Sequence, residues 1–180
     1  MKTTQAAAYL LKKSSKEMKY LKLLKLLYLA DRKALLSSGR PISFDHYVSM
    51  DHGPVLSHTY ELISNGEPEQ GRSYWLTHIS SPADYKVHLI RDPGNDHLSE
   101  LEIKFLENIF QEYGQRDQWD LVDNVMHKLP EWEDPQGSAI PIQIRDILTH
   151  SGKTDLEAAE IEHELESISD VKRFFNQQNM

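Results

Sequence analysis

Three histidines recur at a fixed interval in the first third of the chain, and imidazole is a common metal ligand. His46, His52 and His58 follow one another every six residues. Gly53 and Pro54 stand between the last two and interrupt any continuous helix, so the three rings cannot share one helix face. The spacing therefore does not favour a metal site. We expect no metal ligand and no cofactor in this chain.

Asp31 is the carboxylate with the most unusual surroundings. It follows Leu29 and Ala30 in the most apolar segment of the chain, where a buried carboxylate needs a donor such as Tyr47 or His52. This pattern is typical of a polar group that stabilises a core. An active-site acid is the alternative.

His127 stands at the end of a predicted helix, shortly before Pro130 and Trp132. A histidine in this place can satisfy the last carbonyls of the helix and interacts well with its dipole, so a structural cap is the favoured interpretation. A hydrolase would need His52, His127 and Asp31 to converge in one pocket. The chain has no HExxH, no glycine-rich phosphate loop and no nucleophile with a base and an orienting group. We expect no catalytic residue and no enzyme.

Length and composition describe a single domain. The chain has 180 residues and no cysteine, so disulfides and thiolate chemistry are excluded. A domain of this size buries about two thirds of the surface of its unfolded chain. No convincing signal peptide is present, and no apolar run reaches the roughly 18 residues of a membrane span. We expect a cytoplasmic protein with no membrane partner.

Charge is divided unevenly along the chain. Residues 1–45 hold 10 Lys and Arg against 3 Asp and Glu, whereas residues 46–180 hold 10 against 25. A nucleic-acid-binding regulator is therefore the second functional hypothesis, carried by the basic first segment. The acidic remainder repels phosphate, so any such binding should be weak and steeply salt dependent.

The most apolar and most distinctive stretch lies between residues 20 and 63, and it predicts two of the first three helices. The first expected helix runs from Thr3 to Lys13, and the second starts at a Ser14/Glu17 capping box and ends near Ser38, before Gly39 and Pro41. An aromatic connector over 44–50 follows. The third expected helix spans 55–64, begins at Pro54 and is closed by Asn65-Gly66.

Beyond a polar loop, the rest of the chain predicts one hairpin and four helices. The expected elements are antiparallel strands over 74–79 and 85–90 with Trp75 inward; a helix over 100–113 with a Ser99/Glu102 capping box; a helix over 118–128 stopped by Pro130; a helix from Ile140-Pro141 to His150; and an acidic helix capped by Thr154 and Glu157. The fold class is α+β and mainly helical, a single compact domain of six to seven helices with a small antiparallel sheet. We expect the main domain to span 1–152 and the acidic helix and tail, 153–180, to pack on it or extend it.

Two separated runs resemble a known family, the Panacea domain, also called SocA-like. The first contains LKLLKLLYLAD, then GRPIS, then a run from Tyr47 that ends in HGPV, then Tyr60. The second is the His-Lys-Leu-Pro-Glu-Trp sequence that ends at Trp132. The resemblance implies an antitoxin that neutralises a cognate toxin, which we expect the adjacent gene to encode, and the SocA branch also implies a protease adaptor. The positions that it marks as signature or partner-binding residues are Asp31, Tyr47, His52, Gly53, Pro54, His127, Pro130 and Trp132.

The sequence also suggests where a partner would bind. Residues 155–170 hold seven carboxylates and no lysine or arginine. This helix could dock on the lysine-rich first helices or face a basic toxin. We expect the chain through Gly152 to fold alone and the acidic helix to tune recognition. Gly53 and Pro54 should serve folding rather than a reaction, and Trp132 is expected in the core.

Overall fold

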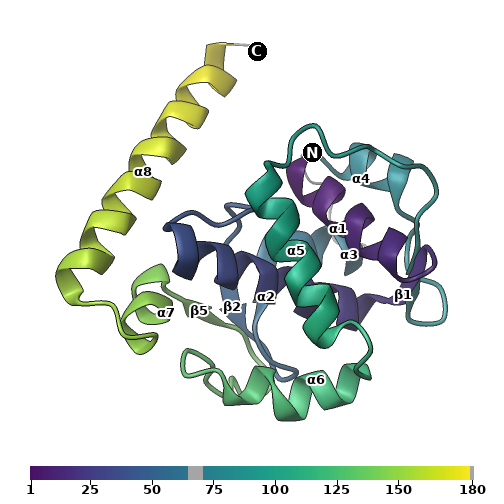
Figure 1. Cartoon of the computed structure of the whole chain (residues 1–180), viewed down its shortest axis with the longest axis horizontal. Coiled ribbons are helices and arrows are strands. Elements are labelled where there is room, and N and C mark those ends of the chain that lie inside the picture. Colours follow the sequence, from purple (N-terminus) through teal and green to yellow (C-terminus); the bar gives the residue numbers. More distant parts are fainter. Residues whose placement is uncertain (65–70, 179–180) are drawn as a thin grey trace.

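Helix α2 (Tyr20–Ser38) runs through the middle of the computed structural model, which describes residues 1–64 and 71–178, with side chains through residue 171 (Figure 1). Every residue from Leu23 to Asp31 is buried, as the wide apolar face predicts. Gly39 takes a left-handed conformation with φ +72° and ends the helix, also as predicted. The α+β, mainly helical fold class is confirmed.

The other helices surround α2. Helix α5 (Glu100–Tyr113) crosses it on one side and α1 (Lys2–Lys13) lies beside both (Figure 1). The remaining elements are α3 (Ser57–Ser64), α4 (Arg72–His78), α6 (Gln118–Asn124), a 3-10 turn η1 (Met126–Lys128), α7 (Ile144–His150) and α8 (Asp155–Gln178). The described part therefore has eight α-helices, with α4 not predicted. The expected closure of α3 by Asn65-Gly66 lies outside the described residues.

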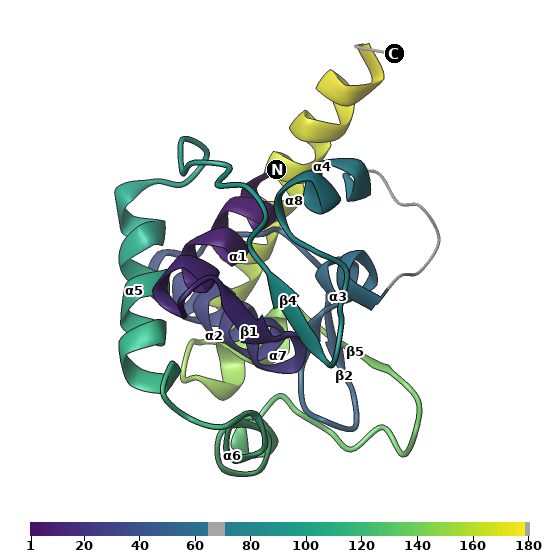
Figure 2. The same cartoon turned by 90° about the vertical axis from the view of Figure 1, so that its right-hand side faces the viewer.

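Two small antiparallel sheets lie against the helices. One pairs β1 (Glu17–Lys19) with β4 (Lys86–His88), and Met18 faces Val87. The other has the order β3-β2-β5, with β2 (Tyr47–Ser49) between β3 (Val55–Leu56) and β5 (Ile140–Ile142). The β1 and β4 ribbon is visible in Figure 2. A small antiparallel sheet was predicted, but of its two expected strands only the one over 85–90 is present, as β4.

The hairpin predicted over 74–79 and 85–90 is wrong in its first strand. Residues 72–78 form α4, in which Trp75 is fully buried and which packs on α1. The aromatic and β-branched composition suggested a strand, but tertiary packing decides such short segments. The second strand exists as β4, and its partner is β1. Residue Ile79 keeps only an isolated bridge to Leu89.

The capping box predicted at Ser14 and Glu17 is also wrong. Ser15 and Lys16 both take positive φ, +56° and +70°, which turns the chain sharply after α1. Glu17 then enters β1, where its carboxylate contacts Lys86 and His88 across the strand pair. The cross-strand ion pairs replace the local cap, so α2 begins only at Tyr20.

Two further helix starts differ from the prediction. Residues 140–142 were expected to begin a helix but form β5, and α7 starts at Ile144. Pro54 does not begin a helix, because Val55 and Leu56 pair with β2. Helix α3 starts at Ser57, and its first N–H groups are capped by Asp45, whose Oδ2 accepts from the backbone N–H of Thr59 at 2.9 Å.

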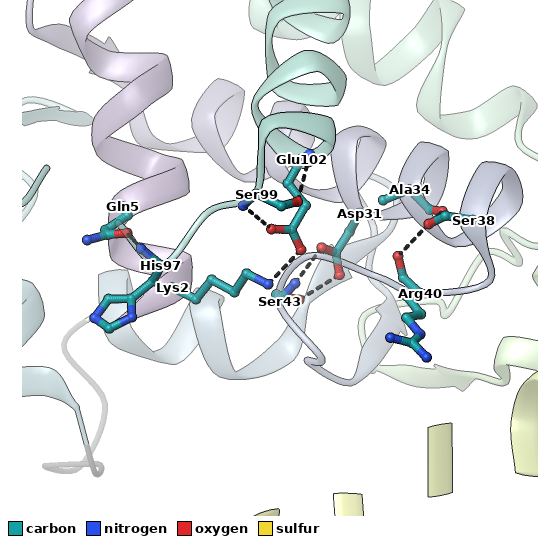
Figure 3. Close-up of polar contacts among 10 residues, drawn as sticks. All are labelled: Lys2, Gln5, Asp31, Ala34, Ser38, Arg40, Ser43, His97, Ser99 and Glu102. Atoms are coloured by element: carbon teal, nitrogen blue, oxygen red, sulfur yellow. Dashed lines mark hydrogen bonds and ion pairs between the residues drawn. The ribbon is translucent and has the colours of Figure 1, made fainter. Parts of the chain in front are cut away.

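Other local signals are confirmed. The Ser99/Glu102 capping box starts α5, and Glu102 also accepts from Lys2 at 2.6 Å, which ties α1 to α5 (Figure 3). Thr154 and Glu157 form the reciprocal cap of α8. No helix within residues 1–64 and 71–178 has the length and apolar character needed to cross a membrane.

Candidate functional site

The turn over residues 50–54 depends on Gly53. Its φ is +89°, and its N–H donates to the Met50 carbonyl at 2.8 Å. A Cβ at this position would lie 2.5 Å from Cβ of Met126, well inside van der Waals contact. Two constraints therefore require glycine at this position: the positive φ of the backbone, and the close approach of Met126 in the 3-10 turn η1.

A buried lysine holds the same turn from the side of α2. Lys25 is fully buried, and its Nζ donates to the carbonyls of Gly53 at 2.8 Å and Pro54 at 3.1 Å. Burial lowers the pKa of this ammonium group to about 7. Lys25 was not singled out from the sequence. The available signal was its position inside the run from Leu23 to Leu27, where leucines flank it on both sides.

His127 and Trp132 bind two other carbonyls of the same turn. Nε2 of His127 lies 3.0 Å from the Asp51 carbonyl, and the indole N–H of Trp132 donates to the Met50 carbonyl at 3.1 Å. The two rings stack with centroids 4.1 Å apart. His127 was predicted to cap the end of its own helix, but it serves a carbonyl of another segment instead. Trp132 is half-buried rather than fully in the core.

Pro130 lies in the exposed tight turn that leads from η1 to Trp132. The backbone N–H of Trp132 donates to the Leu129 carbonyl at 3.0 Å across this turn. Since proline fixes its own φ, Pro130 restricts the backbone of this turn. Five of the predicted positions, His52, Gly53, Pro54, His127 and Trp132, therefore meet at one turn, with Pro130 next to them.

This turn forms one wall of a cavity of about 300 Å³. Four aromatic side chains, Tyr20, Tyr60, Tyr85 and Trp119, contribute to the remaining lining, and the buried Lys25 also lines the cavity. Tyr85 is 73% exposed and Trp119 is 47% exposed, although both are large apolar groups. His52 packs edge-on against Trp119, with ring centroids 5.1 Å apart. Trp119 was not singled out from the sequence. It is one of several residues of a predicted helix that has a polar face.

Asp31 and Tyr47 belong to a separate, buried polar network. The Asp31 carboxylate accepts from the backbone N–H of Ser43 at 2.8 Å, from the Ser43 hydroxyl at 2.6 Å and from the Tyr47 hydroxyl at 3.1 Å (Figure 3 shows the Ser43 bonds). Burial raises the pKa of Asp31 to about 6 despite these bonds. Tyr47 is the donor that the sequence predicted, whereas His52 is not and Ser43 was missed.

The same network continues to the second signature run. Glu131 is buried, accepts from the Tyr28 hydroxyl at 2.9 Å and forms a two-pronged ion pair with Arg32. The Tyr28 ring packs edge-on against Tyr47 at 5.7 Å. These bonds connect α2 to the segment before Trp132. Asp31 and Tyr47 therefore stabilise the packing of α2 on its neighbouring segments and do not line the cavity themselves.

The three side chains that a hydrolase would need in one pocket lie in different surroundings. His52 packs on Trp119, His127 stacks on Trp132, and Asp31 bonds to Ser43 and Tyr47. The structure does not bring them together as an acid, a base and a nucleophile. Among the described residues, no group of three or more His, Asp or Glu side chains could hold a metal ion.

Comparison with known proteins identifies the family of this chain. The family model described as antitoxin SocA-like, Panacea domain, matches residues 23–133, which include all eight signature positions. Neither the curated proteins nor the solved structures give a significant match. Since the matched segment is more than half of the chain, this protein belongs to the SocA-like antitoxin family and carries its Panacea domain.

Proposed function

We propose that this protein is a non-enzymatic antitoxin that binds its cognate toxin directly, in the cytoplasm, and that the toxin is the product of the adjacent gene. The aromatic cavity is the proposed docking site. One observation carries this proposal: Trp119 and Tyr85 stand exposed at the mouth of a concave, largely apolar cavity. Tryptophan and tyrosine beside a pocket are the residues that most often dominate binding energy at protein interfaces.

The signature residues support this location, because their contacts converge on the cavity wall. Lys25 binds the Gly53 carbonyl of the 50–54 turn, and His127 and Trp132 bind the Asp51 and Met50 carbonyls. A rigid wall lowers the entropy cost of binding, which is how a small domain gains affinity. In this proposal the signature residues position the docking site, and the aromatic residues at its mouth contact the toxin.

The basic first segment does not favour the nucleic-acid alternative, because five of its eight lysines are engaged within the chain. Lys2, Lys12 and Lys13 form ion pairs with Glu102, Asp92 and Glu107. Lys22 donates to the Gly114 carbonyl at 2.6 Å, and Lys25 is buried. Cations engaged in this way are poorly placed to contact phosphates.

The test is co-expression of the adjacent-gene product with the wild-type chain and with Trp119→Ala. We expect the wild type to restore growth and to co-purify with the toxin, and Trp119→Ala to lose both while keeping its thermal midpoint. Leu101→Ala is the matched control, since Leu101 is also about half exposed, at 49%, but lies away from the cavity. Equal loss in both variants, or none in Trp119→Ala, would contradict the docking site.

The cellular level of the toxin distinguishes two ways of neutralising it. Occlusion leaves the toxin level unchanged, whereas delivery to a protease lowers it.

A further inference from the structure

The lining of the aromatic cavity contains hydrogen-bonding groups that the chain itself leaves unused. Among the side chains that the structure describes, none forms a hydrogen bond with the hydroxyl of Tyr20, Tyr60 or Tyr85. The same is true of the indole N–H of Trp119 and the side-chain amide of Gln118, which also line the cavity. Burial raises the pKa of Tyr20, and Tyr60 and Tyr85 raise it further, so both hydroxyls lie within electrostatic reach of Tyr20.

Gln118 is the clearest sign that a ligand belongs in this cavity. The residue is only 8% exposed, yet its amide has no partner within the described part of the chain. A side-chain amide has two donor hydrogens and an acceptor oxygen, and buried groups of this kind are nearly always paired in native proteins. Because Gln118 lines the cavity, a ligand there can supply the missing hydrogen bonds.

Tyr85 is displayed by an unfavourable backbone conformation. Asp84 and Tyr85 form the two-residue turn before β4, and their φ angles are +50° and +62°. Two backbone hydrogen bonds of 2.9 Å between Ala83 and Lys86 close the turn. The Tyr85 ring stacks on that of Tyr20, with centroids 6.4 Å apart. A bulky residue rarely adopts positive φ, and strain of this kind is concentrated at functional sites.

The free groups of the lining determine which occupant is complementary. All of them can donate a hydrogen bond, and the indole N–H of Trp119 can only donate. The lining contains one lysine, Lys25, and one carboxylate, Asp51, so it carries little net charge. The complement is therefore a neutral, apolar group that is rich in acceptors and poor in donors.

A polyproline II segment has this chemistry. Its backbone carbonyls form no internal hydrogen bonds and are free to accept. Proline adds an apolar ring and has no N–H of its own. Aromatic-lined grooves are a recurring way to bind such segments. An α-helical segment would fit the donors less well, because its carbonyls accept from its own N–H groups.

We infer that the aromatic cavity binds a proline-containing, extended segment of the toxin. Its rings pack on Tyr85 and Trp119, and its carbonyls accept from the tyrosine hydroxyls and from the Gln118 amide. This inference rests on the proposed function and makes it more specific, since it names the kind of segment that the docking site holds.

The first test removes hydroxyls and keeps the rings. The double variant Tyr20→Phe/Tyr60→Phe deletes two donors of the lining. Tyr74→Phe is the matched control, since Tyr74 is also half-buried and its hydroxyl also has no partner among the described residues, but it lies outside the cavity. We expect the double variant to weaken binding of the adjacent-gene product about tenfold, and Tyr74→Phe to change it less than about twofold.

Gln118→Met separates a ligand-binding role from a structural one. Methionine has a similar size and no amide, and no hydrogen bond within the described chain is lost. We expect the variant to keep the thermal midpoint of the wild type and to bind the adjacent-gene product more weakly. A lower midpoint with unchanged binding would show that the amide serves the fold and would contradict the inference.

A blocked polyproline peptide provides a probe that does not depend on the toxin. Its control is a glycine–serine peptide of equal length, which has free carbonyls but no proline rings. We expect polyproline to shift the indole NMR resonance of Trp119 in the wild type and in Tyr74→Phe, and to shift it much less in the double variant and in Gln118→Met.

The two probes fail in different ways. If the adjacent-gene product does not bind the wild type, the proposed function fails, and the peptide still decides what the cavity binds. Absence of any shift with polyproline, an equal shift with the glycine–serine peptide, or equal effects of the tyrosine variants inside and outside the cavity would overturn the inference.

Discussion

At the scale of single residues, Gly53 is the position with the least freedom. We predict that Gly53→Ala lowers the free energy of unfolding by about 2 kcal/mol or more, because it adds a clash with Met126 to the strain of a positive φ. Chemical denaturation measures this change. Gly152→Ala is the matched control, since Gly152 has φ +96° and an added Cβ there would meet no atom within 4 Å. Equal losses in the two variants would show that the contact with Met126 is unimportant.

Lys25 makes stability depend on pH. Its pKa is about 7 in the folded protein and 10.5 in the unfolded chain, so the unfolded chain binds more protons between these values. Stability contributed by this site therefore rises with pH through that window and is constant below pH 7. We predict that the difference in unfolding free energy between wild type and Lys25→Met shifts in favour of wild type by about 5 kcal/mol across the window.

Denaturant unfolding at several pH values measures this difference, and groups that titrate in both proteins cancel. Lys33→Met on the same helix is the control, because Lys33 lies outside the buried run. A constant difference between wild type and Lys25→Met from pH 7 to 10.5 would mean that the ammonium group is solvated. The wall of the aromatic cavity would then lack its support from α2.

At the scale of elements, the 50–54 turn depends on a segment that lies far away in the chain, around His127 and Trp132. We predict that Trp132→Phe, which keeps a ring but removes the N–H bond to the Met50 carbonyl, lowers the unfolding free energy by about 1 kcal/mol. Trp132→Ala should cost more, but less than the roughly 3–5 kcal/mol of a fully buried tryptophan. The same variants should weaken toxin binding, as isothermal titration calorimetry would show. Unchanged affinity together with reduced stability would mean that the turn does not support the docking site.

Long, strongly patterned elements were predictable from sequence, whereas the short elements β1 and α4 were not. The buried face of α2 and the capping box of α5 are local features, determined by the spacing of Leu residues and by Ser99 and Glu102. The strand β1 and the helix α4 depend on partners far away in the chain, so their local composition was misleading. Signature positions could be named in advance, but their roles could not. The reason is that His127 and Trp132 act on carbonyls of a distant turn.

At the scale of the whole molecule, α8 joins the core that the matched domain forms. Ala158 and Leu165 are buried with the other apolar residues, although they lie after Gly152. We predict that truncation after Gly152 leaves a folded protein with a lower thermal midpoint and weaker toxin binding. Calorimetric scans and affinity measurements check the two parts separately. An unfolded product, or unchanged binding by a folded one, would each contradict this division of the chain.

The central claim is that the toxin docks at the aromatic cavity, and hydrogen–deuterium exchange of the complex tests it most directly. We predict that the adjacent-gene product slows exchange in the 50–54 turn and in α6 around Trp119, relative to the free protein. Amides of α1 and α4, which do not line the cavity, should exchange at unchanged rates. A footprint confined to α1 and α4, with no protection at residues 50–54, would contradict the account.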